Sequence, residues 1–143
     1  MQLVPAKDED HGPMLALWER SVRATHDFLT EEDIAFFLPL ILTQGFASVT
    51  LYCAKDQGGR LLGFVGVAGD KVEMLFVDDG LMGLGVGKAL MALATSQLGA
   101  SRVDVNEQNP QALGFYLHLG FKVVARSPLD SMGKAFPILH LAL

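Results

Sequence analysis

Apolar residues recur every three or four positions in the first part of the chain, which predicts a helix. A short strand over residues 2–6 precedes it, and Asp8 or Asp10 can cap its N-terminus. The helix is expected to run to about Phe28. Its buried face is predicted to carry Met14, Leu17, Trp18 and Val22.

A second helix is predicted from a capping box. Thr30 is followed three residues later by Asp33, so each side chain can accept a hydrogen bond from the other residue's backbone amide. Acidic residues in the first turn also suit the positive end of the helix dipole. The helix should reach about Gln44, with a kink or break at Pro39 and an end at Gly45.

Three strand-like apolar runs follow, at residues 49–54, 61–68 and 72–77. Short turns separate them, with Gly58-Gly59 after the first run and Gly69-Asp70 after the second. Connections this short join antiparallel neighbours, so the three runs predict a meander.

The second half of the chain alternates helices and strands. Asn109 is a good N-cap and Pro110 fits the first turn of a helix, while Gly99 ends the helix before it. The order of elements predicts an α+β fold with a mixed sheet. The predicted elements are helices at 86–98 and 110–119 and strands at 102–106, 121–126 and 135–142.

Composition narrows the class of protein. The chain has 143 residues, 50% of them hydrophobic and 19% charged, which favours one domain spanning 1–143. Cys53 is the single cysteine, so no internal disulfide forms and a reducing compartment is expected. The longest apolar run, 35–42, is far shorter than the ~20 residues of a membrane-crossing helix, and residues 1–10 do not resemble a secretory signal. We expect a cytoplasmic protein without a membrane partner.

The net charge is −5, from 11 Lys plus Arg and 16 Asp plus Glu. This balance argues against binding to a nucleic-acid backbone and fits cationic partners better.

A glycine-rich turn joins a predicted strand to a predicted helix. Residues 78–88 read Asp-Asp-Gly-Leu-Met-Gly-Leu-Gly-Val-Gly-Lys, and helix-start amides in such a turn favour a phosphate. A Walker A loop is excluded, because Met82 and Ala89 replace its Gly and its hydroxyl residue. The dinucleotide fingerprint fails at Lys88 and Leu90, where it requires Gly. The alternative is a structural role, in which the glycines only allow a tight turn between the strand and the helix.

A second motif lies downstream, in which Asn109 and Ala112 precede Tyr116 and Gly120-Phe121. Together the two motifs resemble the GCN5-related N-acetyltransferase (GNAT) superfamily. Its phosphate loop reads Arg/Gln-x-x-Gly-x-Gly/Ala, and its next helix carries Asn-x-x-Ala-x-x-x-Tyr followed by Gly-Phe. The resemblance is clear over residues 72–121.

Other segments are similar to the small bacterial YjaB-type branch of that superfamily, at residues 20–29, 103–109 and 133–140. Two positions depart from the family pattern: Met82 replaces the usual Arg or Gln of the loop, and Asp79 stands where Pro is frequent.

The resemblance implies a GNAT fold: a central, mixed, mostly antiparallel sheet, splayed between its fourth and fifth strands and flanked by about four helices. It also implies acetyl-CoA as cosubstrate, with its pyrophosphate on the loop amides and its pantetheine along the preceding strand, and no metal. The implied cofactor-binding residues are Leu75, Phe76, Val77, Met82, Gly83, Leu84, Gly85, Val86, Gly87, Lys88, Asn106, Asn109, Ala112, Phe115 and Tyr116.

Tyr116 matches the family's general acid, which protonates the departing CoA thiolate. A tyrosine of pKa ~10 is a weaker acid than a thiol of ~8.5, so full proton transfer is uphill by ~2 kcal/mol unless the site lowers the tyrosine pKa. A strong hydrogen bond to the thiolate can serve instead. The alternative role is an aromatic packed between its helix and Phe121.

The acceptor amine must be neutral to attack. For a lysine of pKa ~10.4, deprotonation near pH 7.4 costs ~4 kcal/mol, so a base helps most there. Glu73 is the first candidate, since strand alternation predicts that it shares a face with Leu75 and Val77. His26 is the second, between the first two helices. The alternative for Glu73 is a solvated carboxylate on a strand, and the alternative for His26 is a structural histidine.

The remaining reactive side chains are predicted to be structural. Cys53 falls on an interior strand and is expected to pack in the core, since direct attack by the amine needs no enzyme nucleophile. His11, His118 and His140 have no spacing that suggests a metal site and are predicted to be structural or surface residues.

The sequence thus predicts an acetyl-CoA-dependent N-acetyltransferase that acts on a primary amine in a ternary complex. Protein lysine, a peptide α-amine, a polyamine and an antibiotic amine remain open as acceptors, and the branch resemblance favours protein lysine. The alternatives are a non-catalytic acyl-CoA-binding module and an acyltransferase for a longer acyl chain. A monomer and a homodimer both remain open.

Overall fold

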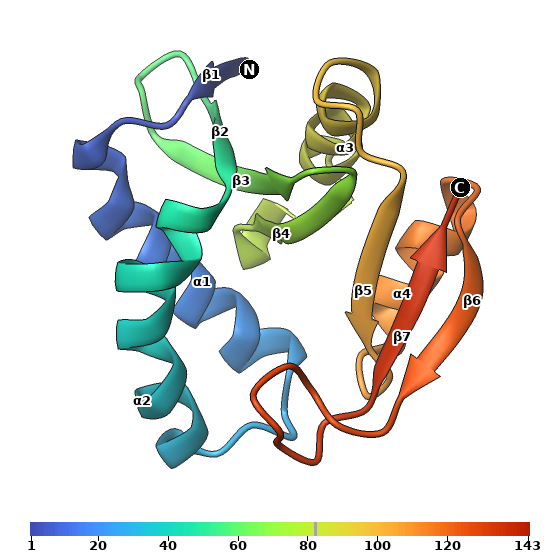
Figure 1. Cartoon of the computed structure of the whole chain (residues 1–143). Helices are drawn as coiled ribbons and strands as arrows, with labels where there is room; N and C mark the ends of the chain where they lie inside the picture. The colour runs from blue at the N-terminus through green and yellow to red at the C-terminus, as the bar shows by residue number, and fades with distance from the viewer. Residues whose placement is uncertain (82) are drawn as a thin grey trace. The chain divides into compact units, whose positions relative to one another are not determined.

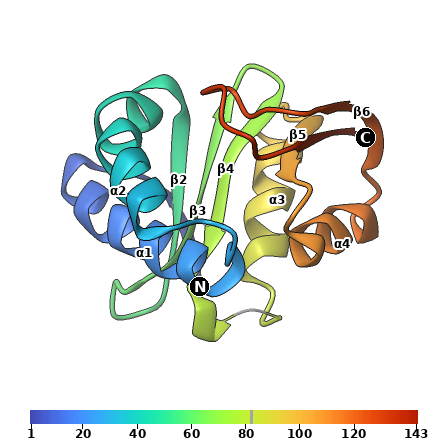
Figure 2. The ribbon, with the colours of Figure 1, turned by 90° about the horizontal axis from the view of Figure 1, so that it is seen from below.

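The computed structural model describes residues 1–81 and 83–143, which form two compact units, Met1–Ala100 and Ser101–Leu143 (Figure 1). In the first unit the helices α1 and α2 lie on one face of a sheet and α3 lies on the other (Figure 2). Its elements are β1 Gln2–Pro5, α1 His11–Thr25, α2 Glu31–Leu40, β2 Thr50–Lys55, β3 Leu61–Ala68, β4 Lys71–Val77 and α3 Val86–Ser96, with short 3-10 turns at Asp8–Asp10, Phe46–Ser48 and Asp79–Leu81.

The sheet of the first unit has the order β1-β2-β3-β4, and every neighbouring pair is antiparallel. The predicted meander is therefore confirmed. Gly63 and Phe64 illustrate the alternation of β3: Phe64 packs among the side chains of α1, while a β-carbon at Gly63 would meet Val86 and Leu90 of α3. Two faces of one sheet thus bury two different helical layers.

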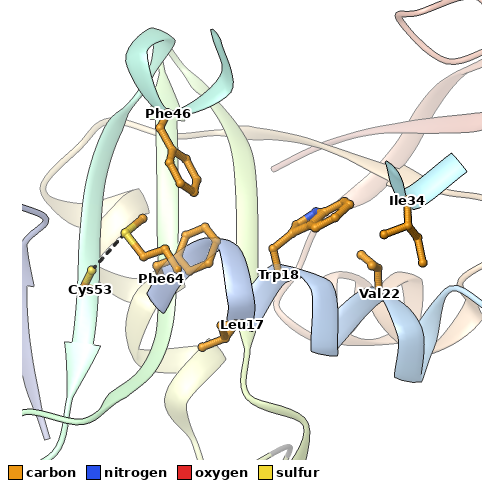
Figure 3. Close-up of a cluster of buried hydrophobic side chains, with 8 residues drawn as sticks. Leu17, Trp18, Val22, Ile34, Phe46, Cys53 and Phe64 are labelled. Atoms are coloured by element: carbon orange, nitrogen blue, oxygen red, sulfur yellow. Dashed lines mark hydrogen bonds between the residues drawn. The ribbon is translucent and has the colours of Figure 1, made fainter. Parts of the chain in front are cut away.

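The core of the first unit lies between α1, α2 and the sheet (Figure 3). The helical apolar stripe predicted from the sequence supplies half of it. The Phe46 and Phe64 rings meet edge to face, with centroids 5.9 Å apart, a geometry that aromatic quadrupoles favour. The buried members are Met14, Leu17, Trp18, Val22, Ile34, Phe46, Cys53 and Phe64.

The start of α2 matches its sequence signature. The Asp33 amide donates to Thr30 Oγ1 over 3.1 Å, and the Thr30 amide donates to Asp33 Oδ2 over 3.0 Å. The predicted capping box is confirmed. Beyond Pro39 the α-helix ends at Leu40 and continues as a π-helical turn that ends at Gly45.

The start of α1 differs from the prediction. Asp10 is the N-cap residue, but its side chain makes no capping bond to α1. Its carboxylate instead accepts from the Lys7 amide and from Lys55 Nζ, both at 2.8 Å. The charged Lys55, which the fold brings from β2, outcompetes the helix amides for this carboxylate. The helix also ends at Thr25, three residues before the predicted end.

The second unit contains β5 Arg102–Asn106, α4 Pro110–His118, β6 Lys122–Ser127 and β7 Ile138–Ala142. Its strand order is β5-β7-β6, and both pairs are antiparallel. Strand β7 begins three residues later than predicted, after Pro137, because a tight turn occupies the start of the predicted strand: the Phe136 amide donates to the Lys134 carbonyl over 2.8 Å.

Among the residues that the structure describes, no helix is both long and apolar enough to span a membrane.

Candidate active site

The glycine-rich turn leads from β4 into the N-terminus of α3. Gly83 has φ +84° and Gly85 has φ +88°, a left-handed conformation that side chains with a β-carbon rarely adopt. Gly85 is the N-cap residue, and the Ala89 amide donates to the Gly85 carbonyl over 3.0 Å. A β-carbon at either glycine would meet nothing within 4 Å, so the backbone conformation alone requires glycine here.

The first turn of α3 offers an anion site. The amides of Val86, Gly87 and Lys88 precede the first residue that can find a carbonyl inside the helix, and they lie at the positive end of its dipole. Val86 is buried, whereas Leu84 is 70% exposed and Lys88 is exposed. The loop therefore anchors one side chain in the core and leaves its surface open to a phosphate. Met82, also predicted to bind the cofactor, lies outside the described residues.

Close packing fixes the position of this turn. A β-carbon built at Gly63 on β3 would stand 2.8 Å from the carbonyl oxygen of Phe76 and 3.1 Å from Cγ1 of Val86. Glycine at 63 therefore lets α3 approach the sheet directly behind the anion site. Sequence analysis did not single out Gly63. A glycine inside a predicted strand is the signal that points to such a close approach.

Two arginines meet at the end of β4. Asp78 Oδ2 accepts from Arg20 over 3.3 Å and from Arg60 over 3.4 Å. The Asp78 side chain is 13% exposed, while those of Arg20 and Arg60 are 54% and 65% exposed. One carboxylate thus holds two guanidinium groups at the end of β4, and the adjacent Asp79 supplies a second negative charge there. Sequence analysis missed the cluster of Asp78 and the two arginines, because the three residues come from separate elements.

The side chains of β4 divide between two faces. The Phe76 ring packs against Phe64, with centroids 5.6 Å apart, and Met74 packs against the same core. Leu75 is half-buried and Val77 is buried. Phe76 is thus a core residue by its side chain, and only its backbone is left for the predicted contact with pantetheine.

Glu73 lies at an irregularity of the sheet. Gly66 pairs with Met74 and Val67 pairs with Val72, so Glu73 is the extra residue of a β-bulge. The bulge interrupts the alternation that predicts a shared face for Glu73, Leu75 and Val77, so alternation does not fix the face of Glu73. Its side chain is exposed and lies 3.9 Å from Lys71 Nζ.

His26 follows the last residue of α1, and its backbone amide donates to the Val22 carbonyl over 2.8 Å. The imidazole packs at a tilt on Phe28, with centroids 5.2 Å apart. Burial lowers the pKa of His26 from its ordinary value of 6.5, against a smaller opposing effect of Asp27. His26 is accordingly a neutral imidazole at pH 7, the form that a general base requires.

The second unit carries the other predicted cofactor residues. Asn106 ends β5, and the buried Asn109 caps α4, where its Oδ1 accepts from the Ala112 amide over 3.2 Å. The predicted N-cap at Asn109 and the Pro110 start of α4 are confirmed. Ala112 and Phe115 are half-buried on this helix.

Tyr116 is packed inside the second unit. It is 6% exposed, and its ring meets those of Phe115 and Phe121 nearly edge to face, with centroids 5.1 and 5.8 Å away. Burial raises the pKa of the Tyr116 hydroxyl. The protein thus moves this pKa away from that of a thiol rather than toward it, so the hydroxyl stays protonated at neutral pH.

The predicted residues are divided between the units. His26, Glu73 and the residues of β4 and the glycine turn belong to the first, and Asn106, Asn109, Ala112, Phe115 and Tyr116 belong to the second. Within residues 1–81 and 83–143, no three His, Cys, Asp or Glu side chains form a cluster that could hold a metal ion.

Cys53, His11 and His118 are further side chains that could react or bind a metal. Cys53 is fully buried, with its Sγ 3.7 Å from Met14 Sδ, and burial raises the pKa of its thiol to about 11. Its predicted packing role is confirmed. His11 packs on Phe46, with ring centroids 5.1 Å apart, and His118 is exposed on α4.

Comparison with known proteins places these features in context. The family model for the acetyltransferase (GNAT) domain matches residues 29–136. The peptidyl-lysine N-acetyltransferase YjaB of Escherichia coli K12 is 38% identical over 144 residues, covering 96% of this chain and 92% of that protein.

Solved structures agree with this match. The solution structure of apo-form YjaB from Escherichia coli has a TM-score of 0.88 and 36% sequence identity, and covers 99% of this chain and 95% of that one. The PaiA N-acetyltransferase of Thermoplasma acidophilum, solved in complex with coenzyme A, has a TM-score of 0.72 over the full length of both chains. At 20% identity it is a likeness of fold.

Proposed function

Because the chain belongs to the GCN5-related N-acetyltransferase (GNAT) family, we propose that it moves an acetyl group from acetyl-CoA to a primary amine by direct attack. The observation that carries the proposal is the turn before α3, where two glycines in the left-handed region expose helix-start amides. These amides form the phosphate site that acetyl-CoA needs. Arg20 and Arg60 lie at the end of β4 that leads into this turn, where both donate to Asp78.

The cosubstrate would lie along β4 and the glycine turn. The pyrophosphate would accept hydrogen bonds from the amides of residue 83 and residues 85–88, since the Leu84 amide donates to the Leu81 carbonyl over 3.2 Å. Pantetheine would follow the backbone of residues 75–77. A main-chain amide near Val77 would donate to the thioester oxygen as it gains negative charge. Asn106 and Asn109 are the further residues proposed to contact pantetheine, and Asn109 would keep its capping bond.

In the reaction, the neutral amine attacks the acetyl carbonyl and the C–S bond breaks. The amine proton goes to a base, which later releases it to water, and the departing thiolate takes up a proton from water. We propose that Tyr116 donates a hydrogen bond to the departing thiolate, because its buried hydroxyl stays protonated. The neutral imidazole of His26, or Glu73 acting through water, accepts the amine proton.

We propose a lysine side chain as the acceptor. The support is the 38% identity to a peptidyl-lysine N-acetyltransferase and the net charge of −5, which favours a cationic partner. We also propose that residues 1–143 act as one acetyltransferase domain in the cytoplasm. The family match spans both units, and the single cysteine is a free thiol.

Calorimetric titration with acetyl-CoA, CoA and ATP tests the cosubstrate. The expected result is micromolar binding of both CoA species without binding of ATP, and at least tenfold weaker binding by Gly85→Ala, whose β-carbon is strained at φ +88°. Gly12→Ala is the control, since its β-carbon meets nothing within 4 Å. No heat with either CoA species contradicts the proposal.

Release of the CoA thiol then tests catalysis. Wild-type protein should release thiol only when an amine is present, and Tyr116→Phe should lower the rate by about 10²-fold or more while binding acetyl-CoA normally. If Tyr116→Phe releases thiol as fast as wild type with every acceptor tried, the proposed role of Tyr116 is wrong. Binding without any turnover indicates a non-catalytic acyl-CoA module, and faster turnover with a longer acyl chain indicates a different acyl donor.

A further inference from the structure

Three side chains on the three strands of the second unit form a continuous hydrogen-bonded chain. Ser127 Oγ lies 2.7 Å from His140 Nε2, and His140 Nδ1 lies 2.7 Å from Asp104 Oδ1. A hydroxyl, an imidazole and a carboxylate in this order are the parts of an activated nucleophile. The proposed acetyl transfer uses none of these three residues.

Strand register brings the three residues together. Asp104 on β5 pairs directly with His140 on β7, and His140 pairs with Ala125 on β6. Ser127 lies two residues beyond Ala125, on the same face of β6. A one-residue shift of either pair would move a member to the opposite face.

The strand that carries Ser127 is held in place by its neighbours. Arg126, the preceding residue, forms a two-pronged ion pair with Glu107, with Nη2 to Oε1 at 3.0 Å. The Glu107 amide in turn donates to the Pro137 carbonyl over 2.9 Å, just before β7. The segment after β5 therefore ties β6 to the start of β7, close in sequence to Ser127 and His140.

The chemistry of the groups sets the direction of the hydrogen bonds. An ionised carboxylate only accepts, so Asp104 requires His140 to carry its proton on Nδ1. In the neutral ring Nε2 is then a lone-pair acceptor, and the Ser127 hydroxyl donates to it. This is the tautomer that can take a proton from a serine that attacks a carbonyl.

The three hydrogen-bonded side chains are accessible to a small molecule. The side chains of His140 and Asp104 are 33% and 29% exposed, and Ser127 is half-buried. Cys53, by contrast, is fully buried, and burial raises the pKa of its thiol to about 11. Ser127 is thus a nucleophile candidate that combines an adjacent base with access from solvent.

We propose that Ser127, His140 and Asp104 form a second acyl-transfer site, which cleaves small activated carboxylic esters through an O-acyl-serine. Ser127 Oγ attacks the ester carbonyl and passes its proton to His140 Nε2, and the ester C–O bond breaks to release the alcohol, which takes that proton. Water then attacks the acyl-serine with His140 as base, releasing the carboxylic acid and restoring Ser127. Asp104 is a positioning residue that holds the imidazole tautomer.

Labelling with p-nitrophenyl acetate tests the proposal. Wild-type protein should release a burst of p-nitrophenolate close to one equivalent, and peptide mapping of quenched protein should find one acetyl group on Ser127. Ser127→Ala should lose the burst and the label, whereas Ser131→Ala, an exposed serine in the following loop, should keep both. No acetyl on Ser127 in folded wild-type protein overturns the proposal.

The catalytic role of the His140 imidazole must be separated from a structural role, because the hydrogen bonds among Ser127, His140 and Asp104 also join three strands. Asp104→Asn should slow the burst by about 10²-fold or more. Its denaturation midpoint, measured beside that of wild type, shows whether the variant is still folded. His140→Gln should lower the burst equally. Acetylation of Ser127 at the wild-type rate in both variants overturns the relay.

The proposed ester-cleaving site and the proposed acetyl transfer can be disproved independently of each other. Ser127→Ala should acetylate amines from acetyl-CoA at the wild-type rate, and Tyr116→Phe should keep the ester burst. A burst that disappears in Tyr116→Phe and persists in Ser127→Ala would assign the esterase chemistry to the acetyltransferase site and overturn the second site.

Discussion

Gly63 lies against Val86: a β-carbon at position 63 would stand 3.1 Å from Cγ1 of that valine and 2.8 Å from the carbonyl oxygen of Phe76. The first distance is tight for a real β-carbon, and the second is shorter than real contacts. The N-terminus of α3, with the amides proposed to bind phosphate, can approach β3 this closely only over glycine.

Gly63→Ala should therefore weaken acetyl-CoA binding by about tenfold and destabilise the fold by about 1–3 kcal/mol, because α3 must move away from the sheet. Calorimetry and thermal unfolding measure the two effects. Gly12→Ala, in open space within α1, should match or exceed wild-type stability and bind normally. Wild-type affinity in Gly63→Ala would show that the position of α3 does not limit binding.

The pH dependence of turnover should distinguish the two candidate bases. Burial lowers the pKa of His26 below 6.5, so an imidazole base is active above that pKa and is lost as the pH falls through it. If His26 is the base, kcat/KM should fall on the acid side, and His26→Gln should abolish that limb. Glu73→Gln should then retain the limb. The reverse pattern in the two variants would assign the base to Glu73.

Cys53 should be chemically silent. It is fully buried and burial raises the pKa of its thiol to about 11, so it should react with a disulfide reagent only as fast as the protein unfolds. Cys53→Ala should keep acetyl transfer at the wild-type rate and lose about 1–2 kcal/mol of stability through lost packing with Met14. Loss of turnover in a folded Cys53→Ala protein would indicate a covalent acyl-cysteine.

Acid should weaken the contact between α1 and β2. Burial acts to raise the pKa of Asp10, but hydrogen bonds from Lys55 and Lys7 outweigh it and lower that pKa below 3.8. A carboxylate with a lowered folded-state pKa stabilises the fold above the unfolded value and loses this contribution as the pH falls through the folded value. Stability should thus drop below about pH 4.

Asp10→Asn should cost about 1–3 kcal/mol at pH 7, because Lys55 loses its charged partner, and should show less change in stability between pH 7 and pH 3. Denaturant midpoints measured across that range check this. The exposed Asp8→Asn is the matched control and should follow the wild-type curve. An Asp10→Asn curve parallel to wild type would contradict the assignment.

Local signals in the sequence predicted the elements well. Thr30 and Asp33 form their capping box and Asn109 caps α4, because both signals act within one helical turn. The α+β GNAT fold and the family are confirmed, since the glycine turn and the helix with Tyr116 keep the family's spacing. Acetyl-CoA follows as the family's cosubstrate.

Partners far apart in the chain could not be predicted in this way. Asp10 binds Lys55 of β2 in place of the α1 amides, and a bulge interrupts alternation at Glu73. His140 was predicted to be structural or at the surface, since no neighbour in sequence suggested chemistry. Its partners Asp104 and Ser127 are chosen by strand register, which the sequence pattern leaves open. The individual cofactor and base residues stay predictions.

Acetylation of a lysine peptide tests the central claim most directly. The peptide, with a blocked N-terminus and one lysine, is incubated with the protein and acetyl-CoA, then analysed by mass spectrometry beside a thiol assay. The account predicts one acetyl group on lysine Nζ per CoA thiol released, and a rate lowered about 10²-fold or more by Tyr116→Phe. Two results would contradict the account: binding of acetyl-CoA without acetylation of the peptide, or equal rates in wild type and Tyr116→Phe.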